Sequence, residues 1–135
     1  MRKQKVWLCV PPFAYCMLDQ MITLLNQSPS YWAGDYSVAR EGNPWFHWLL
    51  QQHPLAFEAG IVAWVALFSF LIIALPRRPA MTISIAIVLG HTWATATWIY
   101  WRLPFGYWLT LALFLISAIV VVVTWEKFGV ATGLA

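Results

Sequence analysis

An uncharged run at residues 81–101 has a histidine at its centre. At about 1.5 Å of rise per residue, a helix built from this run matches the roughly 30 Å hydrocarbon core of a membrane. His91 then lies near mid-depth, where an imidazole needs a hydrogen-bond partner or a cavity. The run therefore predicts a transmembrane helix whose neighbours are arranged around His91, either to build a functional site or only to lock the helices together.

Two strips with contrasting side chains follow this helix at helical spacing. Beside a polar strip lies a strip of small residues, a pattern that lets a second helix approach closely. We therefore expect another helix to pack on the small strip. The polar strip comprises Ser84, His91, Thr95 and Trp98, and the small strip comprises Ala86, Gly90 and Ala94.

Composition identifies the chain as an integral membrane protein. Hydrophobic residues make up 61% of the 135 residues and charged residues 10%, whereas soluble domains carry about a quarter charged residues. The length allows a single all-α membrane domain, 1–135. We predict four transmembrane helices at about 6–25, 54–75, 81–101 and 107–125, and a short interfacial helix at about 44–52.

The basic residues lie beside the ends of the predicted spans, not in one patch, which argues against nucleic-acid binding despite a net charge of +3. Only Arg40 and Arg102 fall on one side of the membrane. The excess of positive charge on the other side predicts that both termini lie in the cytoplasm, and with the family resemblance described below this implies the bacterial cytoplasmic membrane. The cytoplasmic group comprises Arg2, Lys3, Lys5, Arg77, Arg78 and Lys127.

The first span carries an acidic residue in the outer half of the membrane. Asp19 lies about 20 Å along the helix from Val6. A carboxyl group at this depth must be protonated, paired or solvated, which favours a functional site. Pro11 and Pro12 either start this helix late or kink it. The run lacks a small-residue cleavage site, so we expect a retained span and not a signal peptide.

A long polar loop at 26–43 precedes the predicted interfacial helix. The Asn43 side chain can cap the free amides of that helix, and Pro44 fits its first turn. The helix has an apolar aromatic side, so it should lie in the outer interface of the membrane. We expect His47 and His53 to be hydrated there, because neither belongs to a metal-binding spacing.

These segments can bring one polar cluster together in the outer half of the bundle. Asp19 and His91 differ in depth by about 5 Å and can meet if their faces match, which makes them the candidate metal ligands. Glu41 and Asn43 can fold over them from the loop. Glu58 lies in the first turn of the second span. The N-terminus of a helix also favours a carboxylate, which gives Glu58 a structural explanation. An aromatic outer surface comprises Trp45, Trp48, Trp98, Trp101 and Trp108.

An Asp in the first span, the E-x-N-P motif Glu41-Gly42-Asn43-Pro44 before a short helix, and three further spans follow one another in this chain. This order resembles a family of small bacterial four-helix membrane proteins of unknown function. The resemblance covers much of the chain and implies the four-helix fold, but no activity. A lysine often occurs in the second span of that family, and this chain has none there.

Three classes of function fit these features. We favour a non-catalytic accessory subunit that contacts lipids and other integral membrane subunits through apolar helix faces and the aromatic surface. One alternative is a metal- or proton-handling protein that uses Asp19 and His91. Another is a pigment-binding protein with His91 as axial ligand, so a cofactor would be a metal ion, a bound lipid or a pigment. An enzyme is disfavoured, because no nucleophile, base and orienting residue occur together.

Overall fold

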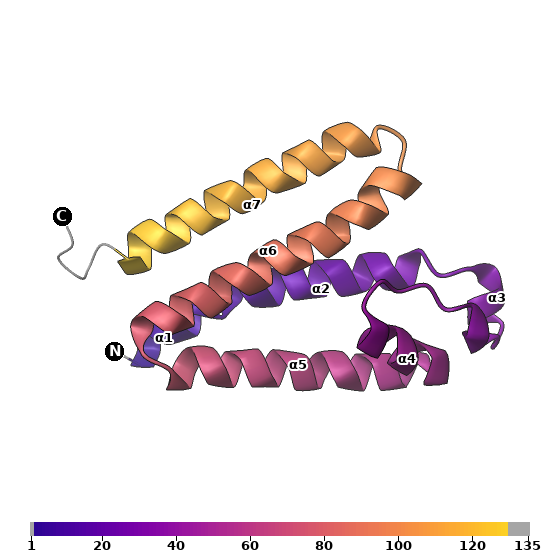
Figure 1. Cartoon of the computed structure of the whole chain (residues 1–135), viewed down its shortest axis with the longest axis horizontal. Helices are drawn as coiled ribbons and strands as arrows, with labels where there is room; N and C mark the ends of the chain where they lie inside the picture. Colours follow the sequence, from indigo (N-terminus) through magenta and orange to yellow (C-terminus); the bar gives the residue numbers. More distant parts are fainter. Residues whose placement is uncertain (1, 130–135) are drawn as a thin grey trace.

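Four helices of the structure are long and apolar enough to cross a membrane. The computed structural model describes the backbone of residues 2–129 and the side chains of residues 5–127. The described residues contain no β-strand, so the predicted all-α polytopic fold is confirmed (Figure 1). The elements are α1 (Arg2–Leu8), α2 (Val10–Leu25), α3 (Pro29–Trp32), the 3-10 helix η1 (Tyr36–Val38), α4 (Pro44–Gln52), α5 (Pro54–Ala74), α6 (Arg77–Arg102) and α7 (Gly106–Gly129).

A break at Cys9 divides the first span into α1 and α2. Pro11 and Pro12 occupy the first turn of α2, where their missing amide protons cost no hydrogen bond inside the helix. The chain is already helical before these prolines, in α1, so they do not delay the start of the span; they begin its second segment after the interruption at Cys9.

The first span is tied to the end of α5 by Lys5. Its ammonium group donates hydrogen bonds to the carbonyl oxygens of Leu75, at 2.6 Å, and Ile73, at 3.3 Å. The last carbonyls of a helix lack partners inside the helix and attract a positive charge. Lys5 therefore lies at the turn between α5 and α6. Figure 1 shows α1 at that end of the bundle.

The central helix of the bundle is α6, which packs against α2, α5 and α7. The buried hydroxyl groups of Thr92 on α6 and Ser117 on α7 lie 2.9 Å apart, and Ser117 also donates to the Tyr15 hydroxyl of α2 at 2.9 Å. Farther along α6, Ser84 donates to the Leu8 carbonyl of α1 at 2.8 Å. Hydrogen bonds between helices thus decide which face of α6 is packed.

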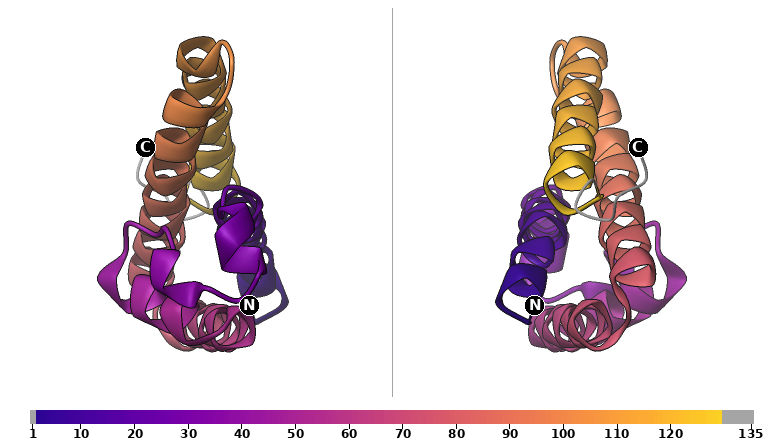
Figure 2. Two further views of the ribbon diagram at one scale, coloured as in Figure 1. Left: turned by 90° about the vertical axis from the view of Figure 1, so that its right-hand side faces the viewer. Right: turned by 90° about the vertical axis from the view of Figure 1, so that its left-hand side faces the viewer.

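The last span, α7, packs mainly along α6 and stands apart from α5 (Figure 2). One seam of α7 is polar: Ser117 and Thr124 are buried, and Thr110 donates to the Ala96 carbonyl at 3.5 Å. Most other side chains of α7 are exposed and apolar. One narrow polar seam therefore faces the bundle, and the rest of α7 is available to lipid or to another helix.

From their tight connection, α5 and α6 diverge toward the end of the bundle that carries α4, which we call the α4 end (Figure 1). There α4 packs closely on α5, because Gly60 has no side chain. A Cβ atom at Gly60 would lie 2.4 Å from Cδ1 of Leu49. At the α4 end, α4 thus replaces α6 as the neighbour of α5.

Within residues 2–129, no helix packs on the small strip of α6, so that prediction was wrong. Ala86, Gly90 and Ala94 line a cavity, and a Cβ atom at Gly90 would meet no heavy atom within 4 Å. The physical reason is that the hydrogen bond from Ser84 to α1 and the contact of Thr92 with α7 turn a different face of α6 toward those two helices. The small strip is left facing the space where α5 diverges.

A glycine at the start of α7 gives a test of this packing. A Cβ atom at Gly106 would lie 2.4 Å from the Ile99 carbonyl oxygen, which is rigid backbone. We expect Gly106→Ala to lower the free energy of unfolding by about 1–3 kcal/mol, as overpacking does. In the matched control Gly90→Ala, the protein should be unchanged or stabilised by about 0.5–1 kcal/mol. Unfolding midpoints in detergent, followed by circular dichroism, measure both; equal midpoints would contradict the packing of the α6–α7 connection.

Candidate functional site

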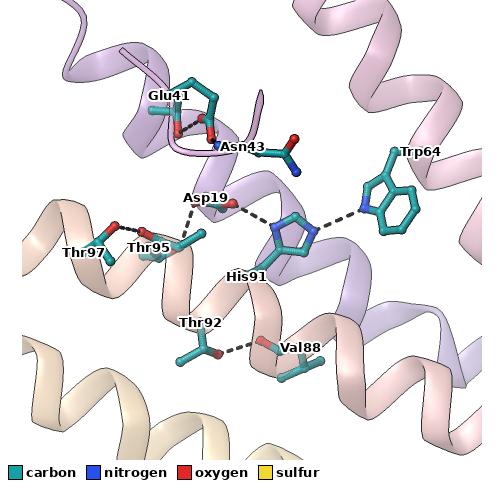
Figure 3. Close-up of polar contacts among 11 residues, drawn as sticks. Asp19, Glu41, Asn43, Trp64, Val88, His91, Thr92, Thr95 and Thr97 are labelled. Atoms are coloured by element: carbon teal, nitrogen blue, oxygen red, sulfur yellow. Dashed lines mark hydrogen bonds and ion pairs between the residues drawn. The ribbon is translucent and has the colours of Figure 1, made fainter. Parts of the chain in front are cut away.

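The side chains of Asp19 and His91 meet, as their similar predicted depths in the membrane suggested. Oδ2 of Asp19 on α2 lies 2.8 Å from Nδ1 of His91 on α6 (Figure 3). The Thr95 hydroxyl donates to Oδ1 of Asp19 at 3.5 Å. On the other side of the imidazole, the Trp64 indole of α5 donates to Nε2 of His91 at 3.4 Å. One chain of hydrogen bonds therefore joins α2, α6 and α5.

The two ring nitrogens of His91 have different roles in this chain. An indole N–H can only donate, so Nε2 accepts the hydrogen bond from Trp64. Nδ1 then carries the proton that is directed at Asp19. The imidazole of His91 is therefore held by one contact on each side, from Asp19 and from Trp64.

A cavity of about 910 Å³ lies between α5 and α6, next to α4, and both Asp19 and His91 are in its wall. The side chains of the pair are 16% and 15% exposed, so the cavity reaches them. Trp93 and Leu67, in the same wall, are 68% and 49% exposed. The cavity therefore opens sideways between α5 and α6, toward the region that membrane lipids occupy.

Glu41 reaches the cavity from the loop. The amide of Gln27 holds the Arg40 backbone through two hydrogen bonds, at 2.7 and 2.8 Å, and so fixes the position of Glu41. Oε1 of Glu41 accepts from the backbone N–H of Asn43 at 2.8 Å, and Oε2 accepts from the Thr23 hydroxyl at 3.3 Å. Burial raises the pKa of Glu41, and the charge of Asp19 adds to the rise, although the bond from Asn43 opposes it.

The other predicted residues of the cluster have distinct positions. Asn43 lines the cavity, but its side chain caps α4 by accepting from the backbone amides of Trp45, at 3.0 Å, and Phe46, at 3.4 Å. This confirms the predicted cap. Glu58 is outside the cavity wall and accepts a hydrogen bond from Gln20, which does line the cavity.

The predicted aromatic surface divides into two groups. Trp45 and Trp98 line the cavity, whereas Trp48, Trp101 and Trp108 are exposed away from it. Of the two histidines expected in the interface, His53 has a structural role as the cap of α5, because its Nδ1 accepts from the Leu55 amide at 3.1 Å.

Sequence reasoning missed Trp64, Gln20 and Thr23 as members of the site. Trp64 lies inside an otherwise apolar span, and its indole N–H was the signal that could have been used, because a buried donor needs an acceptor. Gln20 and Thr23 lie one and four residues after Asp19, on adjoining faces of α2.

The geometry limits the chemistry of the site. Among the described residues there is no group of three or more His, Cys, Asp or Glu side chains that could hold a metal ion. The candidate metal ligands Asp19 and His91 are bonded to each other, and the second ring nitrogen of His91 faces Trp64. A metal or pigment would have to displace one of these partners. As arranged, the pair and Glu41 can form hydrogen bonds to a ligand in the cavity and exchange protons with it.

A double-mutant cycle tests whether the Asp19–His91 contact joins α2 to α6. Asp19→Leu and His91→Leu should each lower the free energy of unfolding by about 1–3 kcal/mol, because each leaves a polar partner unsatisfied. The double variant should lose less than the sum, by a coupling energy of about 0.5–3 kcal/mol. Thr97→Val is a control, since Thr97 is exposed and bonds only within its own helix, to Ala94, among the described residues. Additive effects in detergent unfolding would refute the contact.

Comparison of the chain with models of protein families, with curated proteins and with solved structures finds no match. The likeness to small four-helix bacterial membrane proteins with the E-x-N-P motif therefore stays a resemblance that rests on short motifs.

Proposed function

We propose that this protein is a non-catalytic membrane protein that binds a small amphipathic molecule in the cavity between α5 and α6. The observation that carries the proposal is the cavity itself, which combines mostly apolar walls with polar side chains from Asp19, His91 and Glu41. Its volume of about 910 Å³ lies within the range of about 300–1,000 Å³ that is usual for small-molecule sites.

The position of the opening supports a ligand that comes from the membrane. The cavity opens between two predicted spans, at Leu67 and Trp93, so a lipid-like molecule can reach it without crossing water. The small strip at Ala86, Gly90 and Ala94 supplies a smooth wall for an apolar chain. This role needs no bond to be broken and no metal to be held.

Filling the cavity tests the proposal. The wild-type protein, purified in mild detergent, should retain an amphipathic molecule that native mass spectrometry detects as a bound mass. Gly90→Phe, which places a ring in the open space beside Gly90, should lose that mass. Ala66→Phe is the matched control, because Ala66 is exposed on α5 outside the cavity wall. Retention of the bound mass by Gly90→Phe, or its absence from the wild type, would contradict the proposal.

The exposed face of α7 supports a second role, as an accessory subunit of a larger membrane complex. Apart from its seam, α7 presents apolar side chains such as Ile116, Ile119 and Val122, each more than half exposed. Membrane helices associate through close packing of such faces and through interhelical hydrogen bonds. Binding of a ligand and assembly with a partner are compatible, because the cavity and the exposed face of α7 involve different helices.

We place the protein in a bacterial cytoplasmic membrane with both termini in the cytoplasm. The support is the location of Lys5 at the α5–α6 connection, which Arg77 and Arg78 follow as the first residues of α6, at the end of the bundle opposite α4. Positive residues favour the cytoplasmic side of such membranes. The α4 end and the polar part of the cavity then belong to the outer half.

The accessory role predicts that the protein, extracted from its native membrane in mild detergent, migrates with a much larger assembly. Ile119→Trp should release it from that assembly by disturbing the exposed face of α7. Val62→Trp is the control, because Val62 is equally apolar and exposed but lies on α5. Native gel electrophoresis measures both, and a monodisperse monomer from wild-type membranes would rule out this second role.

A further inference from the structure

We propose that the ligand of the cavity is a cationic amphiphile, a molecule with an ammonium-type head and an apolar tail. This inference rests on the proposed function and adds the charge of the ligand. Three features of the cavity carry it: a carboxylate at its polar end without a cationic partner, tryptophan rings in the same cavity wall, and a smooth apolar wall that leads to the lateral opening.

Among the described residues of the cavity wall, Glu41 is the carboxylate without a cationic partner. The carboxylate of Asp19, in contrast, already lies against Nδ1 of His91, at 2.8 Å. The partners of Glu41 are an amide and a hydroxyl group, neither of which carries a charge. His91 is the single basic side chain in the cavity wall, and its ring nitrogens already face Asp19 and Trp64. The described cavity wall therefore has more negative than positive charge.

The energetic consequence of this imbalance is a preference for a positive ligand. A buried carboxylate without a compensating charge is costly, and the raised pKa of Glu41 reflects that cost. A cation in the cavity would lower this energetic cost, whereas an anionic head would increase it. A neutral head would gain hydrogen bonds but no charge pairing.

Tryptophan rings line the same cavity as Glu41. Trp45 follows the loop that carries Glu41, and Trp93 and Trp98 belong to the α6 wall of the same cavity. The face of a tryptophan ring attracts cations, most strongly where water is excluded. Trp98 already has one such contact, because the guanidinium carbon of Arg102 lies 5.8 Å from its ring centroid. Arg102 itself is exposed and outside the cavity wall.

The remaining wall fits an apolar tail. Gly90 and Ala94 of α6 face the cavity together with Ala63 and Leu67 of α5. These side chains carry no polar group, and they lie beside the opening between the two helices. A tail can therefore extend toward the membrane while the head remains near Glu41.

The test compares two probes of nearly equal size in maltoside micelles at mildly alkaline pH: dodecyltrimethylammonium, which is cationic, and dodecyldimethylamine oxide, which has no net charge. Tryptophan fluorescence titration gives the affinities, and native mass spectrometry confirms the bound mass. The wild type should bind the cation about tenfold more tightly than the amine oxide. Glu41→Gln should remove this preference. Asp35→Asn should keep it: this variant removes the same charge from the same loop, but Asp35 caps η1 and is outside the cavity wall.

Each outcome has one meaning. A preference for the cation that disappears in Glu41→Gln and persists in Asp35→Asn supports the inference. Equal binding of both probes, lost in Gly90→Phe, would overturn the inference about charge and leave the proposed binding function intact. Binding of neither probe by the wild type would overturn the inference together with the proposed function. Loss of the preference in Asp35→Asn as well would assign it to the net charge of the protein, and so would also overturn the role of Glu41.

Discussion

The contact between Asp19 and His91 is the interaction on which the arrangement of the spans depends. Membrane helices gain little by burying apolar side chains against each other, because lipid tails are equally apolar. Polar contacts therefore decide which faces meet. The Asp19–His91 pair joins α2 to one side of α6, and the Thr92–Ser117 contact joins α7 to another. Together they fix the rotation of α6 about its own axis.

The cavity follows from this rotation and from how α5 is held. α5 is tied to the rest of the bundle near one end by Lys5 and packs against α4 near the other, around Gly60. Between these points the Trp64 indole is the side chain that reaches the polar chain of α6. The middle of α5 thus stands off from the small strip of α6, and a space with polar side chains at one end remains between them.

Much of the fold could be predicted from the sequence, because membrane thickness and helix rise set the length of each span. The Asp19–His91 contact was also foreseeable, since ionisable groups in hydrocarbon must find partners. Which face of α6 packs against other helices could not be foreseen. Ala86, Gly90 and Ala94 permit a close helix but do not require one. Hydrogen bonds of Ser84 and Thr92 to partners on α1 and α7, which lie far away in the sequence, decided the competition. Whether a side chain reaches the cavity, as Trp64 does and Glu58 does not, depends on where α5 lies, which local pattern does not determine.

The hydrogen bonds of Lys5 have a consequence for biosynthesis. The carbonyl groups that accept these bonds belong to Ile73 and Leu75, which follow Lys5 in the chain by 68 and 70 positions. While the ribosome is still making the intervening loop and α4, the ammonium group has no protein acceptor there and stays hydrated at the membrane surface. Only when the last turn of α5 has been translated and inserted can the first hairpin close, so a residue near the start of the chain secures the second span after its insertion.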